Sequence, residues 1–406
     1  MLIKILSIYF LFFTSIAVSA HEGHAAGGNK DARLQQMWAK MLEKKNQIGI
    51  SVASDAKGRI WLVRVEDGHV RVARSDDGGR QFGASVTVNA ESESIISEGE
   101  SRPKIQVFGD LVYASWTQNL AKPFSGNVRF SLSRDAGLTF AAPRTINDDG
   151  LIIPHAFDTL QVDPDGKITL IWLDKRESTT RIAKGEKYVG TSVFYAVSSD
   201  EGRSFGANRK LADNACECCR LALALDQQGV PVAMWRHVFG KNTRDFAFAR
   251  LDGKNTISRV AEDDWSLDAC PHRGGALAVD EQNEVHAVWF TQGRNRQGLF
   301  YRRLSANGVA LSEPMGFGER GAQAGHPAIL VQKNTVYLAW LEFDGKENRI
   351  MLMRSSNNGK DWSQPAKMAA TAGAADYPHL VVVAGQPKLV WNTLDNGLQI
   401  ADITQK

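Results

Sequence analysis

Four cysteines are the residues of this sequence with the greatest capacity for chemistry. Three lie in the segment Cys216-Glu217-Cys218-Cys219, and Cys270 lies further on with His272 beside it. Thiolate and imidazole groups bind soft or borderline ions, so this set suits Cu(I) or Zn(II). An even number of cysteines in an exported chain also fits two disulfides, although bridges within the segment would be strained. Three interpretations stay open: disulfides, a copper or zinc site, and a redox or nucleophilic thiol.

Polar residues that could bind a ligand lie near the starts and ends of apolar segments throughout the chain. Arginine can bind a carboxylate or phosphate in bidentate fashion, and a central pocket needs such groups on several loops. The ligand-binding candidates are Arg102, His155, Asp158, Asp174, Arg176, Arg220, Arg236, His237, Arg273, His326 and His379. The candidates for a catalytic acid and a catalytic tyrosine are Asp158 and Tyr377. Polar residues are common in any solvated loop, so these candidates depend on a fold that brings their loops together.

An internal repeat predicts such a fold. A short apolar strand ending at or near tryptophan recurs at Trp61, Trp116, Trp172, Trp235, Trp289, Trp340 and Trp391. Each copy has an apolar strand before it and an alternating strand after it, and most have a weaker fourth strand. Four antiparallel strands repeated in this way are typical of a propeller blade, which buries its faces only against neighbouring blades. We therefore predict an all-β propeller of four-stranded antiparallel blades, with seven blades, or six as the alternative.

A turn motif lies between the third and fourth strands of four repeats. It has the form Ser-x-Asp-x-Gly-x-x-aromatic, with asparagine replacing aspartate once. The carboxylate can accept backbone N–H groups of the turn, glycine supplies a positive φ, and the ring packs against the blade. The copies are Ser75, Asp77, Gly79 and Phe82; Ser133, Asp135, Gly137 and Phe140; Ser198, Asp200, Gly202 and Phe205; and Ser355, Asn357, Gly359 and Trp362.

This motif resembles the Asp box of the sialidase superfamily, also called the bacterial neuraminidase repeat. The resemblance covers the chain from about residue 48 and implies that the boxes are structural and lie on the face away from an active site. Catalysis in that family uses three arginines, a tyrosine nucleophile activated by glutamate, and an aspartate acid/base. Arg102, Arg220 and Arg273 could supply the three arginines, whereas no matching Tyr–Glu pair is evident and the cysteine segments are not part of the family's pattern.

Propeller topology predicts which loops meet. Loops that precede the first strand of a blade and loops that follow the second strand open on one face, and the Asp boxes mark the other face. Cys216, Cys218, Cys219 and Cys270 precede the first strands of adjacent units, so we expect their sulfur atoms to lie close together. The arginine and histidine candidates should line a pocket on the same face.

The N-terminal segment predicts export. Residues 1–20 form a short apolar run after one lysine and end on Val18-Ser19-Ala20, which is typical of a cleavable signal peptide. We expect a flexible histidine-containing tail over residues 21–30, a short helix over 31–47 and the propeller over 48–406. The protein should be periplasmic or secreted, without membrane insertion after cleavage. The net charge of +3 and the lack of basic tracts give no indication of nucleic-acid binding.

Three functional hypotheses follow. The first is an exported binding protein whose pocket of cysteine, histidine and arginine holds a metal ion, copper or zinc, or a small anionic ligand or glycan. The second is a glycan-processing enzyme, a sialidase-like exo-glycosidase that uses an arginine-lined pocket. The third is a structural scaffold for protein interactions. Fold alone does not distinguish between them.

Overall fold

Antiparallel strands make up almost all of the regular structure in the described residues. The computed structural model describes residues 48–97 and 99–404. Within these residues the helices are α2 (Arg176–Ala183) and the 3-10 turn η1 (Arg320–Ala322), and neither is long and apolar enough to cross a membrane. The predicted signal peptide (1–20), tail (21–30) and helix (31–47) lie outside the described residues.

The strands fall into consecutive sets along the chain. The first three sets are β1 (Ser51–Ser54), β2 (Ile60–Glu66), β3 (His69–Ser75) and β4 (Val86–Thr87); β5 (Lys104–Phe108), β6 (Leu111–Asn119), β7 (Gly126–Ser133) and β8 (Arg144–Thr145); and β9 (His155–Val162), β10 (Ile168–Asp174), β11 (Thr191–Ser198) and β12 (Arg209–Ala215). The next two are β13 (Ala222–Leu225), β14 (Pro231–Phe239), β15 (Thr243–Arg250) and β16 (Ile257–Arg259); and β17 (Ala276–Val279), β18 (Glu284–Gln292), β19 (Gln297–Ser305) and β20 (Met315–Phe317). The last two are β21 (Gly325–Gln332), β22 (Thr335–Phe343), β23 (Asn348–Ser355) and β24 (Ala366–Thr371); and β25 (His379–Val383), β26 (Gln386–Thr393) and β27 (Gly397–Asp402).

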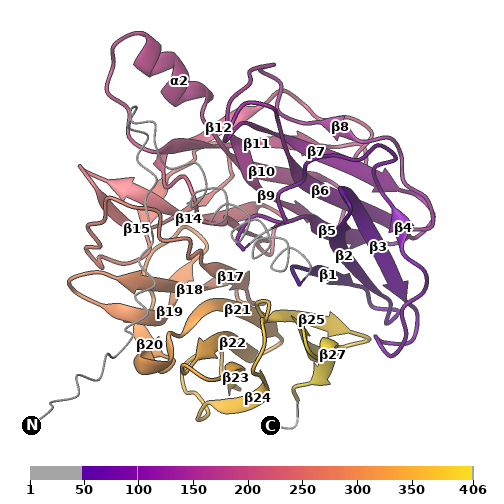
Figure 1. The fold of residues 1–406 in the computed structure, drawn as a ribbon. Helices are drawn as coiled ribbons and strands as arrows, with labels where there is room; N and C mark the ends of the chain where they lie inside the picture. The colour runs from indigo at the N-terminus through magenta and orange to yellow at the C-terminus, as the bar shows by residue number, and fades with distance from the viewer. Residues whose placement is uncertain (1–47, 98, 405–406) are drawn as a thin grey trace, which may run out of the picture.

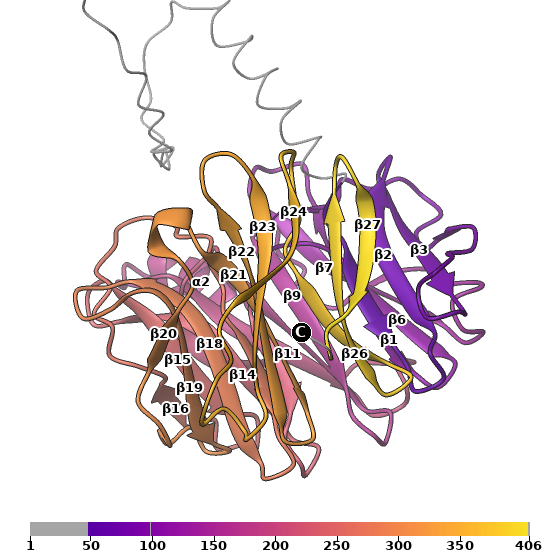
Figure 2. The same cartoon turned by 90° about the horizontal axis from the view of Figure 1, so that it is seen from below.

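Each set is an antiparallel sheet in which sequence neighbours pair. Four of the sheets have four strands, and the last has three strands in the described residues. The third and fourth sets are joined into one eight-stranded sheet, but the two halves share only the bridge between Ala215 and His237. A view turned by 90° shows the strands running between two opposite faces of the molecule (Figure 2). The all-β class and the four-stranded antiparallel sheets predicted from the repeat are confirmed.

The first strand of every set lies at the centre of the molecule. Each of these strands contacts the first strand of the next set, from β1 through β5, β9, β13, β17 and β21 to β25, and β25 contacts β1 again. The labels of β1, β5, β9, β17, β21 and β25 accordingly surround the middle of Figure 1. The described chain therefore has a propeller-like arrangement, in which the sheets radiate from a ring of inner strands.

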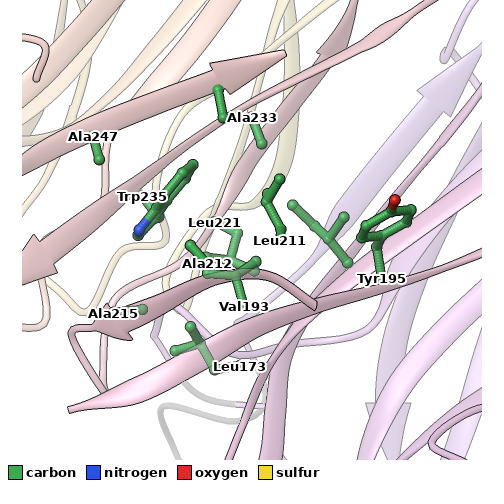
Figure 3. Close-up of a cluster of buried hydrophobic side chains, with 12 residues drawn as sticks. Leu173, Val193, Tyr195, Leu211, Ala212, Ala215, Leu221, Ala233, Trp235 and Ala247 are labelled. Atoms are coloured by element: carbon green, nitrogen blue, oxygen red, sulfur yellow. The ribbon is translucent and has the colours of Figure 1, made fainter. Parts of the chain in front are cut away.

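Hydrophobic side chains between adjacent sheets hold the sets together. The seven repeated tryptophans all lie on second strands and are at most 1% exposed. Figure 3 shows one such layer, where Leu173 and Val193 of the third set lie near Trp235 and Ala233 of the fourth. Burial of a large aromatic side chain at the same place in each repeat contributes a few kcal/mol per blade, which is why the residue recurs.

The four Asp boxes have the same geometry and occupy the turns between third and fourth strands. The Asp135 carboxylate accepts hydrogen bonds from the Ser133 hydroxyl at 2.7 Å and the Thr139 backbone at 2.9 Å. The Gly137 amide donates to Ser133 Oγ at 2.8 Å, and the glycine has φ +88°. The corresponding serine-to-carboxylate or serine-to-amide contacts in the other boxes measure 2.7–2.9 Å. The serine and aspartate bonds lie within the turn itself, and the Ala136 carbonyl of the second box also accepts a hydrogen bond from Trp61 Nε1 of the preceding set at 3.0 Å.

Candidate functional site

A water-accessible channel runs into the ring of inner strands. Its volume is about 290 Å³, and residues of β1, β5, β9, β13, β17, β21 and β25 all line it. Loops that precede these strands surround the opening. We call the group Glu100, Arg220, Arg273, His326 and Tyr377 the channel mouth.

The cysteine centre lies beside the mouth, on the loops before β13 and β17. We use this name for Cys216, Cys218, Cys219, Cys270 and His272. The donor atoms of the first three cysteines all lie within 4.8 Å of one another, and so do those of Cys218, Cys270 and His272. The first three cysteines are buried, whereas Cys270 and His272 are exposed. The strand register predicted this proximity, and the structure brings the five residues together.

All four cysteines are free in the structure, which does not support the disulfide interpretation. The Sγ atoms of Cys216 and Cys218 are 3.7 Å apart, whereas a disulfide requires about 2.05 Å. The short segment cannot fold back far enough to pair adjacent residues without strain. Its sulfur atoms instead face one common volume.

Two arginines, the buried Arg236 and the half-buried Arg244, support the cysteine centre. Arg244 Nη1 donates to Cys216 Sγ at 3.1 Å. Arg236 is 1% exposed and donates to the carbonyls of Arg244, Arg273 and Phe290, each at 2.8 Å. Hydrogen bonds from Cys218 and Cys219, and then the charge of Arg244, lower the pKa of the Cys216 thiol. Arg236, predicted as a ligand-binding residue, therefore holds the loops of the centre in place.

Glu100 connects the cysteine centre to the mouth. Its carboxylate accepts hydrogen bonds from the backbone amides of Arg220 and Gly274, which follow Cys219 and Cys270 closely in sequence. The other carboxylate oxygen lies 3.1 Å from Nδ1 of His326. Burial raises the pKa of Glu100, but Arg220 and His326 outweigh it and hold the pKa at about 2. Sequence reasoning missed Glu100, although it lies two residues before the candidate Arg102.

Arg102 has its guanidinium fully engaged by the fold. It donates to Asp376 Oδ2 at 2.6 Å, to the Ile50 carbonyl at 2.9 Å and to the Gly99 carbonyl at 2.8 Å. The same guanidinium lies 4.6 Å from the ring centroid of Tyr377. Arg102, which was predicted to bind a ligand, therefore has few N–H donors left for one.

Other cations near the mouth are less engaged. The Arg273 guanidinium lies over the Phe290 ring at 4.7 Å and has no hydrogen bond or ion pair with any described residue. Lys104, which the sequence analysis did not single out, lines the channel, and burial and then Arg102 lower its pKa to about 8. Arg220 Nη1 lies 3.8 Å from Glu100 and its other nitrogens donate to backbone carbonyls. The Tyr377 ring stacks on His326 with centroids 3.8 Å apart.

The remaining candidates do not reach the mouth. His155 donates from Nδ1 to the Gly126 carbonyl, and its Nε2 lies 3.0 Å from Asp149. The donor atoms of Asp149, His155 and Asp174 lie within 4.8 Å of one another, as metal ligands would. The Arg176 guanidinium, 3.0 Å from Asp174, already neutralises the negative charge of this group.

Asp158, His237 and His379 are also held by their surroundings. Asp158 is buried and accepts hydrogen bonds from the hydroxyls of Ser115 and Thr117. His237 packs against Phe239, and burial lowers its pKa to about 4. His379 lines the channel, and its Nε2 is buried without a hydrogen-bond partner in the described residues.

Several solved structures are similar to this chain, all at low sequence identity. The polysaccharide lyase Uly1 has a TM-score of 0.54 with 11% identity, over 88% of this chain and 90% of that one. An ulvan lyase bound to a GlcA(1-4)Rha3S saccharide has a TM-score of 0.52 with 10% identity, over 88% and 94%. A leech intramolecular trans-sialidase has a TM-score of 0.47 with 10% identity, over 85% and 83%. No protein-family model and no curated protein matches the sequence. The similarity to the two lyases establishes the propeller-like fold, which glycan-active proteins share.

Proposed function

We propose that this protein is an exported binding protein that holds a soft metal ion, copper or zinc, in its cysteine centre. The observation that carries the proposal is the convergence of four free thiols and one imidazole, from two loops far apart in sequence, into two adjoining groups of three donors that share Cys218. Soft sulfur ligands select ions such as Cu(I) and Zn(II).

The alternative role for these thiols is apolar packing, since buried cysteine behaves as a small hydrophobic residue. Two contacts favour metal binding over packing. Arg244 donates to Cys216 Sγ, which stabilises a thiolate rather than a neutral thiol. Cys270 and His272 are exposed and lie against the buried cysteines through Cys218, so an ion has a route from solvent to the buried sulfur atoms.

The proposal includes a seven-bladed propeller of the sialidase-like, Asp-box type. Seven sets of strands with a closed ring of contacts between their first strands support the blade count. Four turns with one hydrogen-bond pattern support the relation to the Asp box. The apolar run of residues 1–20 supports export, which the intact mass of the mature protein tests.

Metal analysis combined with thiol titration tests the metal-binding function. Protein isolated from the extracytoplasmic fraction should contain at least one equivalent of copper or zinc per chain. Its thiols should react with a disulfide reagent only after a chelator removes the ion. Cys218→Ser, which removes a donor of both groups, should lose the metal, and His69→Ala, which alters a histidine of β3, should retain it. Metal-free protein that takes up neither ion on addition would rule out the function.

We propose as a second candidate function that the channel mouth binds the acidic group of a glycan. The favouring observation is that Lys104 lines the cavity and the Arg273 guanidinium lies near Gly325 at the start of β21, while neither cation forms an ion pair within 4.0 Å in the described residues. The ulvan lyase with the same fold was solved with a saccharide that contains GlcA, an acidic sugar. Bidentate capture by arginine suits such a carboxylate.

Titration with a glucuronate oligosaccharide tests this second function. Arg273→Ala should weaken binding at least tenfold, whereas Arg294→Ala at an exposed position should not. Binding should also weaken above pH 8, because Lys104 has its pKa lowered to about 8 and loses its charge there. Turnover of this oligosaccharide or of an aryl sialoside, abolished by Tyr377→Phe, would make the protein an enzyme. Equal affinity of Arg273→Ala and the unaltered protein would exclude the mouth as the binding site.

A further inference from the structure

The five donors of the cysteine centre form two groups rather than one. Cys216, Cys218 and Cys219 make the first group, and Cys218, Cys270 and His272 make the second. Cys218 belongs to both. Within the described residues no four of these donors all lie within 4.8 Å of one another.

This arrangement does not match a single four-coordinate zinc site. Tetrahedral coordination with Zn–S bonds of about 2.3 Å places every pair of sulfur atoms roughly 3.8 Å apart. The Cys216 and Cys218 sulfur atoms meet that spacing at 3.7 Å, but Cys270 does not join the group that contains Cys216 and Cys219. One zinc ion would bind either group through three donors and leave two others unused.

We propose that the cysteine centre holds two Cu(I) ions, each bound by three donors, with the Cys218 thiolate bridging them. This inference rests on the proposed metal-binding function and specifies its ion and its stoichiometry. Cu(I) is a soft d¹⁰ ion that favours sulfur ligands and is stable with three of them, and a thiolate sulfur has enough lone pairs to bridge two such ions. One ion lies among the three buried cysteines, and the other lies among Cys218, Cys270 and His272.

Charge and protons balance in this arrangement. The four thiols release four protons as two singly charged ions bind, so the centre carries a net charge of −2 without any electron transfer. Arg244, which donates to Cys216 Sγ, and Arg236, which donates to the carbonyls of Arg244 and Arg273 on the adjoining loops, supply two positive charges next to the centre. A buried charge needs such compensation, and an apolar cluster of thiols would not need it.

The backbone of His272 gives independent support for the outer ion. Its φ is +47°, a region that a non-glycine residue adopts at a cost of about 1–3 kcal/mol. The imidazole is nevertheless exposed and makes no hydrogen bond with a described residue. A strained, exposed histidine beside two thiols is what a preformed ligand position requires.

Anaerobic titration of the reduced protein with Cu(I), supplied as its acetonitrile complex, tests the proposal. Native mass spectrometry should show two copper ions per chain, and X-ray absorption should show sulfur ligation with a short copper–copper distance. Both measurements use the unaltered protein, so they do not depend on the folding of any variant.

Variants then assign the two ions. Cys219→Ser and His272→Ala should each lose one of the two ions, Cys218→Ser should lose both, and the control His69→Ala should keep both. A single equivalent of copper without a copper–copper distance, or one zinc ion that excludes copper, would overturn the dinuclear proposal and leave the metal-binding function standing. Failure to bind either ion would remove both.

Discussion

The two faces of this propeller-like molecule use their turns in opposite ways. On one face, four Asp-box turns repeat the same contacts between a serine, an aspartate or asparagine and a glycine. On the other face, the segments at the starts of the first strands differ from one another, and those at β5, β13, β17, β21 and β25 contribute different groups to the mouth or to the cysteine centre. A turn whose serine and aspartate bonds lie within the turn can recur in several blades. A residue whose partners lie on other blades has a different environment in each blade and therefore occurs once.

Metal binding should have the largest effect on stability, and it should protect only the face that carries the cysteine centre. An ion that binds the folded state alone stabilises it by about 4 kcal/mol when its free concentration is a thousand times its Kd. We expect Cu(I) to raise the midpoint of thermal unfolding of the reduced protein and to leave that of Cys218→Ser unchanged. Hydrogen exchange should slow around Cys216–Arg220 and not at the Asp-box turn around Asp135. Equal protection of both faces would contradict a local metal site.

Glu100 should lower the free energy of unfolding of the protein as the pH becomes acidic. Its folded-state pKa of about 2 lies below the ordinary value of 4.5, so its contribution is present above pH 4.5 and is lost as the pH falls toward 2. That difference corresponds to a free energy of unfolding on the order of 3 kcal/mol. Urea unfolding at pH 7, 5 and 3 should show a smaller pH dependence for Glu100→Gln than for the unaltered protein. The control Glu281→Gln, at an exposed turn of the opposite face, should retain the full dependence.

A glycine of the repeated turns should be intolerant of a side chain because it packs closely against the preceding set of strands. Gly359 has φ +74°, and an added Cβ would lie 1.7 Å from the Tyr301 hydroxyl oxygen. Gly359→Ala should therefore cost about 2–3 kcal/mol through strain and overlap. Gly385→Ala provides a matched control, because Gly385 has φ +78° but open space around it, and it should cost about 1 kcal/mol. Metal binding should be the same in both variants, and a loss in Gly359→Ala would show that the two faces are coupled.

The smallest effect concerns the carboxylate of a single Asp box. Asp135→Ala removes the acceptor for the turn and should lower the free energy of unfolding by about 1–2 kcal/mol. Asp135→Asn should cost much less, because Asn357 already accepts the equivalent bonds from Ser355 and from the Asp361 amide. Glycan and metal affinities of the folded protein should not change. A stability loss from Asp135→Asn as large as that from Asp135→Ala would mean that charge, and not hydrogen bonding, holds the turn.

The difference between the faces also decided what the sequence could predict. Trp116 and the Ser133–Phe140 turn are local signals that recur, so the strand order and the turns follow from the repeat alone. The proximity of Cys218 and Cys270 follows as well, because equivalent positions of adjacent blades are neighbours. The bonding state of these cysteines does not follow, since it depends on whether the sulfur atoms approach to 2 Å or to 3.7 Å.

The mouth was harder to predict because its residues are defined by distant partners. Arg102 was expected to bind a ligand, but Asp376 and two carbonyls occupy its guanidinium. Glu100 was missed because its partners, the amides of Arg220 and Gly274, carry no signal in side-chain type. Lys104 has a lowered pKa only because the ring encloses it near Arg102.

The buried ion pair between Arg102 and Asp376 joins residues 274 positions apart, on the second and the last sets of strands. A ribosome that adds 5–20 residues per second makes Asp376 roughly 14–55 s after Arg102. Throughout that interval the guanidinium lacks its carboxylate partner, and β1 has no β25 against it. The emerging chain can form single blades early, but the contact between β25 and β1 that closes the ring cannot form until translation is almost finished. A chain released before Asp376 would therefore present an open, unpaired blade to the folding machinery of the cell, and this ion pair marks the completion of the fold.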